Sequence, residues 1–375
     1  MTDYSRILKN NEKAIYILRE LYGLYGYNQF RAGKFEEYDL YVRNKDFLGN
    51  DGILSFTDPR GRAIALKPDI TLSIAKNYEY EPGVTRKLYY DDYVYRLSAD
   101  RGEFREISQT GIECIGDISD YDVCEVIMLA IKSMEMISED FVLDISHMGI
   151  NKGLTAQLNL PDDEEKQLMH CISRKNVHGI RSICERNNIN NEMTVRATAL
   201  VNTYGSMDKI IEEIDQLAVN RSMSEAINEL RLIDRVMKKE MFSDKIRFDF
   251  SVVNDMGYYN GVVFQGFVKG LPTGILAGGR YDNLIKKMGK KGGAIGFSIS
   301  LDMLEGLNDK EKALDLDEIL IVDRNDLPEK INDAVRTYID RGDCIAVQKA
   351  VPKNLKYGKL LRLKDGKVIP FEYDG

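Results

Sequence analysis

The sequence is poor in the side chains that most often bind metals or form covalent crosslinks. It has 3 histidines and 5 cysteines, and no two of the cysteines form a CxxC pair. Their odd number and wide spacing argue against a disulfide framework. No histidine stands at ligand spacing from a cysteine or from another histidine. We therefore expect a protein of a reducing compartment that has no metal site and needs no cofactor.

Long apolar runs are also missing. The sequence has no apolar stretch of about 18 residues, and its first segment, MTDYSRILKNNEKA, has no apolar signal core. A cytoplasmic protein without membrane contact is expected. Basic residues are also outnumbered by acidic ones. The sequence has 52 Lys and Arg and 60 Asp and Glu, which gives a net charge of −8. With a pI near 5.3, nonspecific nucleic-acid binding is not expected to be the main task.

Two kinds of pattern divide the chain of 375 residues. Short strand patterns separated by turns fill the segments before about residue 150 and after about residue 242. The residues between are charged and helical in period, and SMSEAINELRLIDRVMKKEM places Ile227, Leu230, Ile233 and Met237 on one face. We predict a main domain at 1–310 with a helical insertion at about 160–242.

The end of the chain predicts a small separate domain at 318–375. Strand patterns at ILIV (319–322) and CIAV (344–347) flank a helix that Pro328 opens. Antiparallel strands in one block, helices in a second and a mixed tail together predict an α+β fold.

The most informative stretch is FREISQTGIE (104–113), part of a predicted strand at 104–116 that forms a hairpin with a strand at 87–97. Successive side chains of a strand point to opposite faces, so Arg105, Gln109, Gly111 and Glu113 share one side. That side predicts a polar floor, on which the glycine leaves room for the close approach of a ligand.

Several stretches resemble segments of the class II aminoacyl-tRNA synthetases, and most closely those of the histidyl enzyme. Along the chain they follow the order that the family has. The counterpart of motif 2 is VYRLSADRGEFREISQTGIE (94–113), which resembles it. The stretch that resembles the family's segment for binding the amino-acid amine is ALKPDIT (65–71). Two histidine motifs resemble GYYNGVVFQGF (257–267) and AGGRYDNL (277–284), and GGAIGFSISLDML (292–304) stands where motif 3 is expected. The resemblance implies an antiparallel sheet flanked by helices and a pocket for histidine.

The resemblance also implies the residues of that pocket: Asp69, Thr71, Arg96, Gln109, Glu113, Tyr258 and Tyr259. Glu113 and Tyr259 suit the two imidazole nitrogens of a bound histidine. Asp69, Thr71 and Gln109 suit its ammonium group. The alternatives are that Glu113 and Gln109 pair with backbone or arginines, and that Tyr258 and Tyr259 are core residues.

Positive charges that the synthetases use for amino-acid activation are missing. Arg96 and Arg105 match the family pattern, but Asn254 replaces an arginine, and Glu103 replaces another in the motif 2 loop. The segment 299–303 lacks the arginine that ends motif 3. Because preorganised cations stabilise the charge that develops on ATP, we expect the adenylation site to be lost, with no catalytic residue left.

A kept pocket with lost arginines resembles the regulatory subunits of ATP phosphoribosyltransferase, and ALKPDIT and DISHMGI (144–150) resemble that family as well. The resemblance implies a non-catalytic regulatory subunit that activates the short-form ATP phosphoribosyltransferase catalytic subunit. It also implies that histidine acts as the effector and inhibits the first step of histidine biosynthesis. A homodimer within a larger hetero-oligomer is implied, and no tRNA is expected to bind.

Other interpretations stay open. A divergent histidine–tRNA ligase would use the same pocket, and a free-standing amino-acid sensor would bind histidine without a partner. Histidine binding at a subunit interface is a further alternative. In the dimer motif FRAGKFEEYDLY (30–41), Gly33 stands where the family has proline. The basic residues of the tail hairpin mark either a partner surface or a solvated face.

Overall fold

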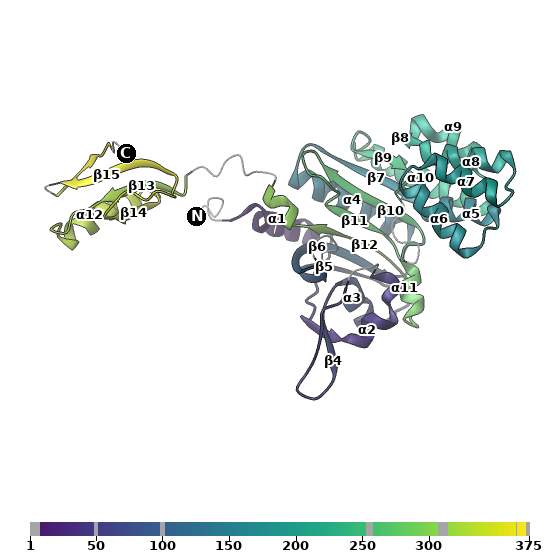
Figure 1. Ribbon diagram of the computed structural model, residues 1–375, viewed down its shortest axis with the longest axis horizontal. Coiled ribbons are helices and arrows are strands. Elements are labelled where there is room, and N and C mark those ends of the chain that lie inside the picture. Colours follow the sequence, from purple (N-terminus) through teal and green to yellow (C-terminus); the bar gives the residue numbers. More distant parts are fainter. Residues whose placement is uncertain are drawn as a thin grey trace. The chain divides into compact units, whose positions relative to one another are not determined.

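The computed structural model divides into two compact units, Met1–Leu307 and Asn308–Gly375, which are described one at a time (Figure 1). It describes residues 8–48, 52–97, 102–252, 258–306, 314–364 and 366–372.

A large sheet forms the centre of the first unit. In the described residues it has nine strands in the order β1-β5-β6-β12-β11-β10-β7-β9-β8. Most neighbours are antiparallel, whereas β1–β5 and β7–β9 are parallel, so the sheet is mixed and the predicted α+β class is confirmed. The strands are β1 (Asn28–Gln29), β5 (Thr85–Leu97), β6 (Phe104–Gly116), β7 (Phe141–His147), β8 (Tyr204–Gly205), β9 (Ile246–Asp249), β10 (Val262–Val268), β11 (Leu276–Arg280) and β12 (Gly293–Ser300).

The hairpin of β5 and β6 agrees closely with the predicted strands at 87–97 and 104–116. Its antiparallel register places Arg96 opposite Arg105 and Tyr90 opposite Gly111. On the other side of β6, Gln109 pairs with Ser300 and Glu113 with Gly296 of β12. Gln109, Gly111 and Glu113 therefore share one face of the sheet, as the alternation of side chains predicts.

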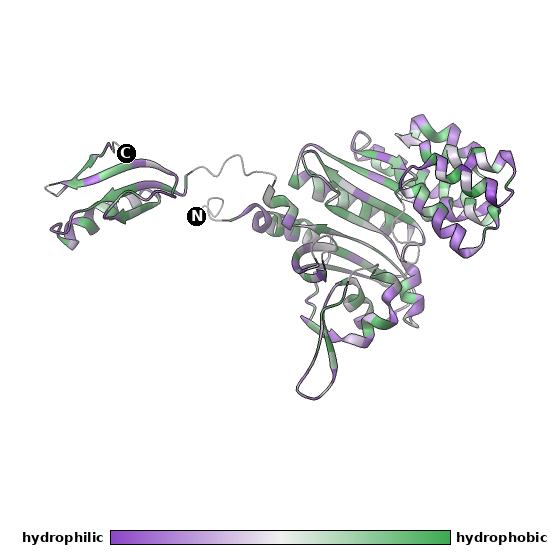
Figure 2. Cartoon of the chain, in the orientation of Figure 1, coloured by the Kyte–Doolittle hydropathy of each residue, from purple (hydrophilic) through white to green (hydrophobic). Residues whose placement is uncertain are grey.

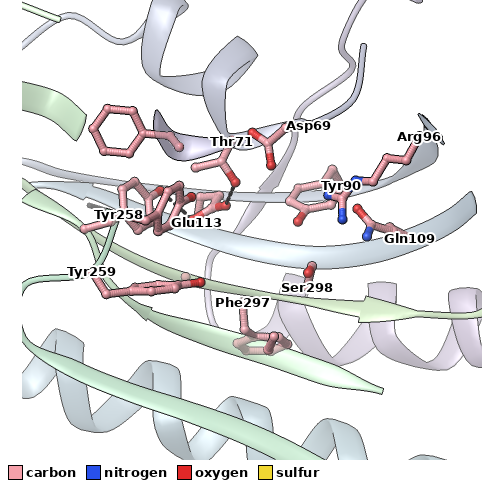
Figure 3. Close-up of a pocket in the computed structure, with 14 residues that line it drawn as sticks. Asp69, Thr71, Tyr90, Arg96, Gln109, Glu113, Tyr258, Tyr259, Phe297 and Ser298 are labelled. Carbon is pink, nitrogen blue, oxygen red and sulfur yellow. Dashed lines mark hydrogen bonds between the residues drawn. The ribbon is translucent and has the colours of Figure 1, made fainter. Parts of the chain in front are cut away.

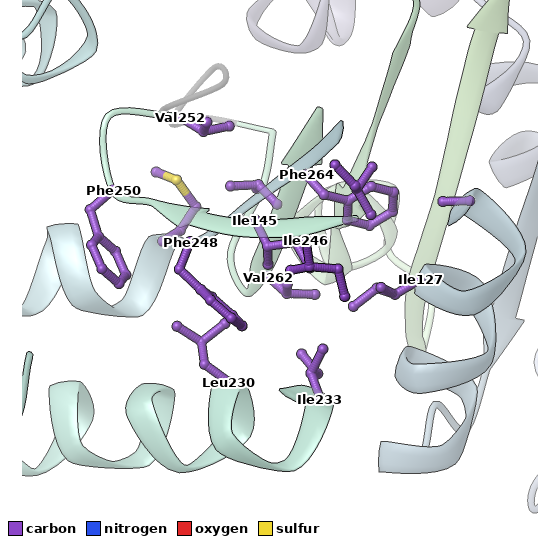
Figure 4. Close-up of a cluster of buried hydrophobic side chains, with 14 of the residues drawn as sticks. Ile127, Ile145, Leu230, Ile233, Ile246, Phe248, Phe250, Val252, Val262 and Phe264 are labelled. Atoms are coloured by element: carbon purple, nitrogen blue, oxygen red, sulfur yellow. The ribbon is translucent and has the colours of Figure 1, made fainter. Parts of the chain in front are cut away.

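Helices cover the opposite face of the sheet. α1 (Asn10–Leu24) and α4 (Asp120–Ile137) pack there, and Ser119 and Asp122 form a capping box that begins α4. Figure 4 shows the core beneath, where Leu230 and Ile233 of α10 (Arg221–Lys239) point toward the sheet and Ile127 of α4 lies beside them. Burial of this apolar face holds the sheet rigid and leaves its other face for the site.

A bundle of helices follows β7. It comprises α5 (Met148–Leu158), α6 (Asp162–Ser173), α7 (Val177–Arg186), α8 (Asn191–Asn202), α9 (Met207–Leu217) and α10 (Arg221–Lys239). Ile227, Leu230, Ile233 and Met237 are all buried, which confirms the single apolar face predicted for α10. Hydrophilic residues cover the outward faces of these helices in Figure 2, as amphipathic helices require.

A second, small sheet places the segment that precedes α3 (Thr71–Asn77). Its strands are β2 (Phe35–Glu37), β3 (Ser55–Thr57) and β4 (Ala63–Leu66), in the order β2-β4-β3, with α2 (Tyr38–Arg43) beside them. Directly after β4, Lys67 is fully buried and its Nζ lies 2.5 Å from Oδ2 of Asp92 on β5. The backbone N–H of Tyr95 also donates to the Lys67 carbonyl over 2.9 Å. These contacts fix Asp69 and Thr71 beside β5.

The second unit has a four-stranded sheet with one helix. β13 (Leu316–Ile321) is parallel to β14 (Ile345–Gln348) and to β15 (Tyr357–Lys364), and β16 (Lys367–Pro370) is antiparallel to β15. α12 (Pro328–Ile339) connects β13 to β14 and begins with Pro328 in its first turn, as predicted. Leu320, Val322, Leu361 and Leu363 are buried against its apolar residues.

Two further findings bear on the expectations from composition. All five cysteines are unpaired. Among the described residues, none of the helices combines the length and the apolar content that crossing a lipid bilayer requires.

Candidate ligand-binding site

A cavity of about 340 Å³ lies on the face of the sheet that α4 leaves uncovered. This size falls within the range of small-molecule sites. All seven sequence-predicted residues line it: Asp69, Thr71, Arg96, Gln109, Glu113, Tyr258 and Tyr259. Figure 3 shows how they face one another from β5, β6, the start of α3 and the segment before β10. The cavity is also lined by Phe47, Tyr90, Ala277, Tyr281, Gly296, Phe297 and Ser298.

Glu113 forms the deep end of the cavity. Its side chain is 2% exposed and accepts two hydrogen bonds, from the Thr71 hydroxyl over 2.6 Å and from the Tyr281 hydroxyl over 2.5 Å. Burial raises the pKa of Glu113 to about 8, against the lowering effect of the two hydroxyls. The partners are hydroxyl groups of the cavity wall, not the arginines or backbone groups of the alternative interpretation.

Asp69 provides a second carboxylate above the same floor. Its Oδ1 accepts the backbone N–H of Leu72 over 2.8 Å, in the first turn of α3. Burial raises the pKa of Asp69, and the charge of Arg96 works in the opposite direction. The helix N-terminus and Arg96 thus hold a carboxylate that faces the cavity.

Arg96 and Gln109 lie together at the other end of the cavity, away from Glu113 (Figure 3). The Nε of Arg96 donates to the carbonyl of Pro68 over 2.9 Å, which connects β5 to the segment before α3. Gln109 is 6% exposed. The cavity is therefore polarised, with a carboxylate and hydroxyls at one end and a guanidinium at the other.

Aromatic rings form one wall. The ring centroid of Tyr258 lies 4.5 Å from that of Tyr259, 5.3 Å from that of Tyr281 and 5.7 Å from that of Phe47. Burial raises the pKa of Tyr90, Tyr258 and Tyr281 well above the ordinary value, so their hydroxyls stay protonated donors. Tyr258 thus contributes both to the wall and to aromatic packing, the two roles that the sequence left open.

Glycines on β6 and β12 make room for side chains of the protein itself. A Cβ on Gly111 would lie 2.2 Å from the Phe297 carbonyl oxygen and 2.7 Å from the Tyr90 hydroxyl. The room at Gly111 is therefore filled by Tyr90 and by backbone, which corrects the expectation that this glycine admits a ligand. A Cβ on Gly296 would lie 1.8 Å from Oε2 of Glu113. Gly296 is the position that lets the carboxylate reach its place.

Other residues that the sequence singled out lie elsewhere. Oδ1 of Asp302 accepts the backbone N–H of Ser108 over 3.1 Å, and the residue does not line the cavity. Glu103 and Arg105 are exposed. Asn254 lies outside the described residues.

Seven of the lining residues were not assigned from the sequence, and Tyr281, Tyr90 and Phe47 illustrate why. Tyr281 lies in AGGRYDNL, so its motif was noticed but its hydroxyl was not assigned. The alternation of side chains along β5 could have placed Tyr90 on the face of the cavity, but no motif marks this residue. Phe47 belongs to the 3-10 helix η2 (Lys45–Phe47) and carries no sequence signal for this role.

The charge balance limits what the cavity can hold. Asp69 and Glu113 are the acids among the lining residues, and Arg96 is the cation. A ligand that brings positive charge to the two carboxylates and negative charge to Arg96 complements this wall. An amino acid with a basic side chain has this distribution of charge.

Comparisons with known proteins agree with the fold. The family model of histidyl-tRNA synthetase matches residues 6–304. An ATP phosphoribosyltransferase regulatory subunit from Oceanobacillus iheyensis is 30% identical over 284 residues, which cover 75% of this chain and 69% of that protein. The regulatory subunit from Caldanaerobacter subterraneus subsp. tengcongensis is 33% identical over 292 residues, covering 76% and 75%.

Solved structures share the fold. A structure from Bacillus halodurans, described as an ATP phosphoribosyltransferase regulatory subunit/histidyl-tRNA synthetase, has a TM-score of 0.75 at 24% identity and covers 96% of this chain and 95% of its own. An ATP phosphoribosyl transferase complex from Thermotoga maritima contains a chain with a TM-score of 0.61 at 18% identity, covering 80% and 97%.

The fold is that of the class II synthetase-like proteins of the histidyl type. Within this group, the chain belongs to the family of ATP phosphoribosyltransferase regulatory subunits.

Proposed function

We propose that this chain is the non-catalytic regulatory subunit of an ATP phosphoribosyltransferase. A separate short catalytic subunit joins ATP to phosphoribosyl pyrophosphate, and the complex performs the first step of histidine biosynthesis. Histidine binds this chain and inhibits that step. The names of the relatives from Oceanobacillus and Caldanaerobacter support the assembly, and so does the complex from Thermotoga.

The observation that carries the proposal is the charge pattern of the cavity. Glu113, which faces the cavity from its deep end, is positioned to accept a hydrogen bond from an imidazole nitrogen. Asp69, with Thr71 and Gln109, suits the ammonium group. Arg96 at the opposite end suits the carboxylate. Histidine fulfils all three requirements at once.

The same cavity argues against activation of the bound amino acid. Adenylation needs cations around the α-phosphate of ATP, because charge develops there in the transition state. Arg96 is the cationic side chain among the lining residues, and it also donates to the Pro68 carbonyl. The segment 299–303 contains no arginine. A binding site that senses its ligand is consistent with this set, and tRNA has no role in it.

Inhibition requires that histidine favour one state of the complex over another. A ligand that binds both states equally shifts neither, and typical coupling free energies are about 1–3 kcal/mol. A homodimer of this chain within a larger hetero-oligomer provides subunit interfaces that can differ between two such states.

Reconstitution tests the proposal. The chain is mixed with a short catalytic subunit, and the turnover of ATP and phosphoribosyl pyrophosphate is measured with increasing histidine. We expect co-purification, a gain in turnover on mixing, and inhibition by histidine that the Glu113→Gln variant loses. Failure to co-purify, or turnover that the chain leaves unchanged, contradicts the proposal.

Two other outcomes identify the rival functions. ATP–pyrophosphate exchange that depends on histidine identifies a divergent histidine–tRNA ligase. Saturable histidine binding by a chain that forms no complex with the catalytic subunit identifies a free-standing sensor.

A further inference from the structure

Three carboxylates meet in the second unit, near the start of β13. Oxygen atoms of Asp317, Glu318 and Asp343 all lie within 4.8 Å of one another. Asp317 and Glu318 belong to β13, and Asp343 ends the turn between α12 and β14. The backbone N–H groups of Asp317 and Glu318 donate to the Cys344 carbonyl over 2.9 and 3.1 Å. These bonds fix the two acidic segments against each other.

Glu318 is the residue of the cluster whose buried carboxylate has an oxygen without a hydrogen-bond partner. Its side chain is 6% exposed, and its Oε2 is buried without a hydrogen-bond partner. Burial raises the pKa of Glu318, and the charges of Asp343 and Asp317 raise it further. A buried carboxylate without a partner costs free energy, and two neighbouring carboxylates add to that cost. A bound cation would offset the repulsion among the three carboxylates and the cost of burying Glu318.

The cations of the protein do not supply this relief by direct contact. Lys359 of β15 stands beside Glu318 in the parallel register, and Arg341 follows α12. Both lower the pKa of Glu318. Within the described part of the chain, neither comes within 4.0 Å of a carboxylate of the cluster as an ion pair. The last turn of α12, which ends beside Asp343, adds the negative partial charge of a helix C-terminus.

We propose that Asp317, Glu318 and Asp343 form a binding site for a hard divalent cation, with calcium as the favoured ion. Carboxylate oxygens are hard ligands that suit calcium, magnesium and manganese rather than zinc or copper. The oxygens of the three side chains lie within 4.8 Å of one another, close enough to share one ion. Calcium accepts irregular oxygen geometry, whereas magnesium demands a near-ideal octahedron and gives up its waters reluctantly.

The site is independent of the histidine cavity and of the proposed function. Its ligands come from the start of β13 and from the turn that leads to β14, so a bound ion would link these two segments. A ligand that binds the folded unit alone stabilises that unit. Lys359 and Arg341 reduce the negative potential, so we expect dissociation constants of about 0.1–1 mM, as in the weaker calcium sites.

The experiment uses the full chain, stripped with a chelator and titrated with calcium, manganese or magnesium alone in a calorimeter. We expect one saturable calcium site that magnesium fills at least about tenfold more weakly. Glu318→Gln and Asp343→Asn should each weaken calcium binding by at least about tenfold. The exposed Asp333 on α12 gives the control Asp333→Asn, which removes the same charge and should bind calcium like the original chain.

A second measurement separates lost ligands from lost folding. Without metal, Glu318→Gln should unfold at a higher temperature than the original chain, because the variant removes a buried charge with no partner. With calcium, only the original chain and the control should gain further stability. No saturable calcium binding below about 10 mM, or equal binding by Glu318→Gln, would overturn the site.

Discussion

Gly296 of β12 stands directly opposite Glu113 of β6, and the missing side chain of the glycine is the space that the carboxylate occupies. A Cβ at Gly296 would come within 1.8 Å of Oε2 of Glu113 and within 2.4 Å of the Ile112 carbonyl oxygen. The position of the acid at the deep end of the cavity thus depends on a neighbour that has no side chain.

Gly296→Ala is therefore expected to abolish the site while the fold survives. The methyl group would displace the Glu113 carboxylate from the Thr71 and Tyr281 hydroxyls, and overpacking of this kind costs about 1–3 kcal/mol. Calorimetry should show histidine binding weakened by at least about tenfold. Gly23→Ala is the control, since nothing lies within 4 Å of its added Cβ. Unchanged affinity in Gly296→Ala would place histidine elsewhere.

The raised pKa of Glu113 predicts how stability without ligand depends on pH. The unfolded chain releases this proton near the ordinary value, whereas the folded chain keeps it up to a pKa of about 8. Between about pH 4.5 and pH 8 the folded state binds more protons, so stability falls as pH rises, by at most about 1.4 kcal/mol per pH unit.

Glu113→Gln should remove that slope, because the amide stays neutral throughout. Urea unfolding at about pH 4 and about pH 8 should bring the two chains together at the lower pH, with the variant more stable at the higher one. Glu185→Gln, at an exposed position on α7, is the control and should follow the original chain. The variant should also bind histidine more weakly, since its amide cannot give up a proton to become the charged acceptor for the imidazole. Equal slopes in both chains would contradict the assigned proton.

Arg96 predicts a difference between histidine and histamine. Histamine keeps the imidazole and the ammonium group and lacks the carboxylate that Arg96 is expected to bind. Losing a charged hydrogen bond costs about 1.5–3 kcal/mol, so Arg96→Met should weaken histidine binding by about 10- to 100-fold. Histamine binding should change much less, and Arg105→Met, at the exposed residue opposite Arg96, should change neither. An equal loss for both ligands would assign Arg96 to another role, such as its bond to the Pro68 carbonyl.

The buried pair of Lys67 and Asp92 predicts a coupled loss of stability and binding. Lys67 has no exposed surface, and its removal leaves Asp92 without its cation, a change that costs about 3 kcal/mol. Because Lys67 directly precedes the segment with Asp69, Lys67→Met should also weaken histidine binding. Lys76→Met breaks the exposed pair with Glu36 and should cost less than about 1 kcal/mol, with histidine binding intact. Chemical denaturation and calorimetry check both effects, and a Lys67→Met chain that is as stable as the control would refute the argument.

The sequence predicted the strands and the floor of the site because these follow from local alternation. β5 and β6 appear within two residues of their predicted bounds, and Gln109 and Glu113 share the predicted face. The wall was harder to foresee. Phe47, Tyr90 and Tyr281 reach the cavity from segments far apart in the chain, and their contacts depend on tertiary packing rather than on any short spacing.

The carboxylates of the second unit illustrate the same limit. Rules for metal sites rely on histidines and cysteines at set spacings, so the sequence predicted no metal site. Asp343 reaches Asp317 and Glu318 because the chain turns back after α12 to form β14 beside β13. The contact joins residues that are 25 and 26 positions apart in the sequence. Oxygen ligands gathered in this way leave no pattern along the chain.

Tyr90 and the Phe297 carbonyl together fill the space above Gly111, so one exchangeable side chain helps to set the extent of the cavity there. A smaller residue at position 90 would lengthen the cavity across β6 without altering Glu113, Asp69 or Arg96. Different residues thus determine which charges the cavity binds and how long a ligand it admits. A substitution at position 90 therefore changes which ligand lengths fit the cavity and leaves the charged groups that line it in place.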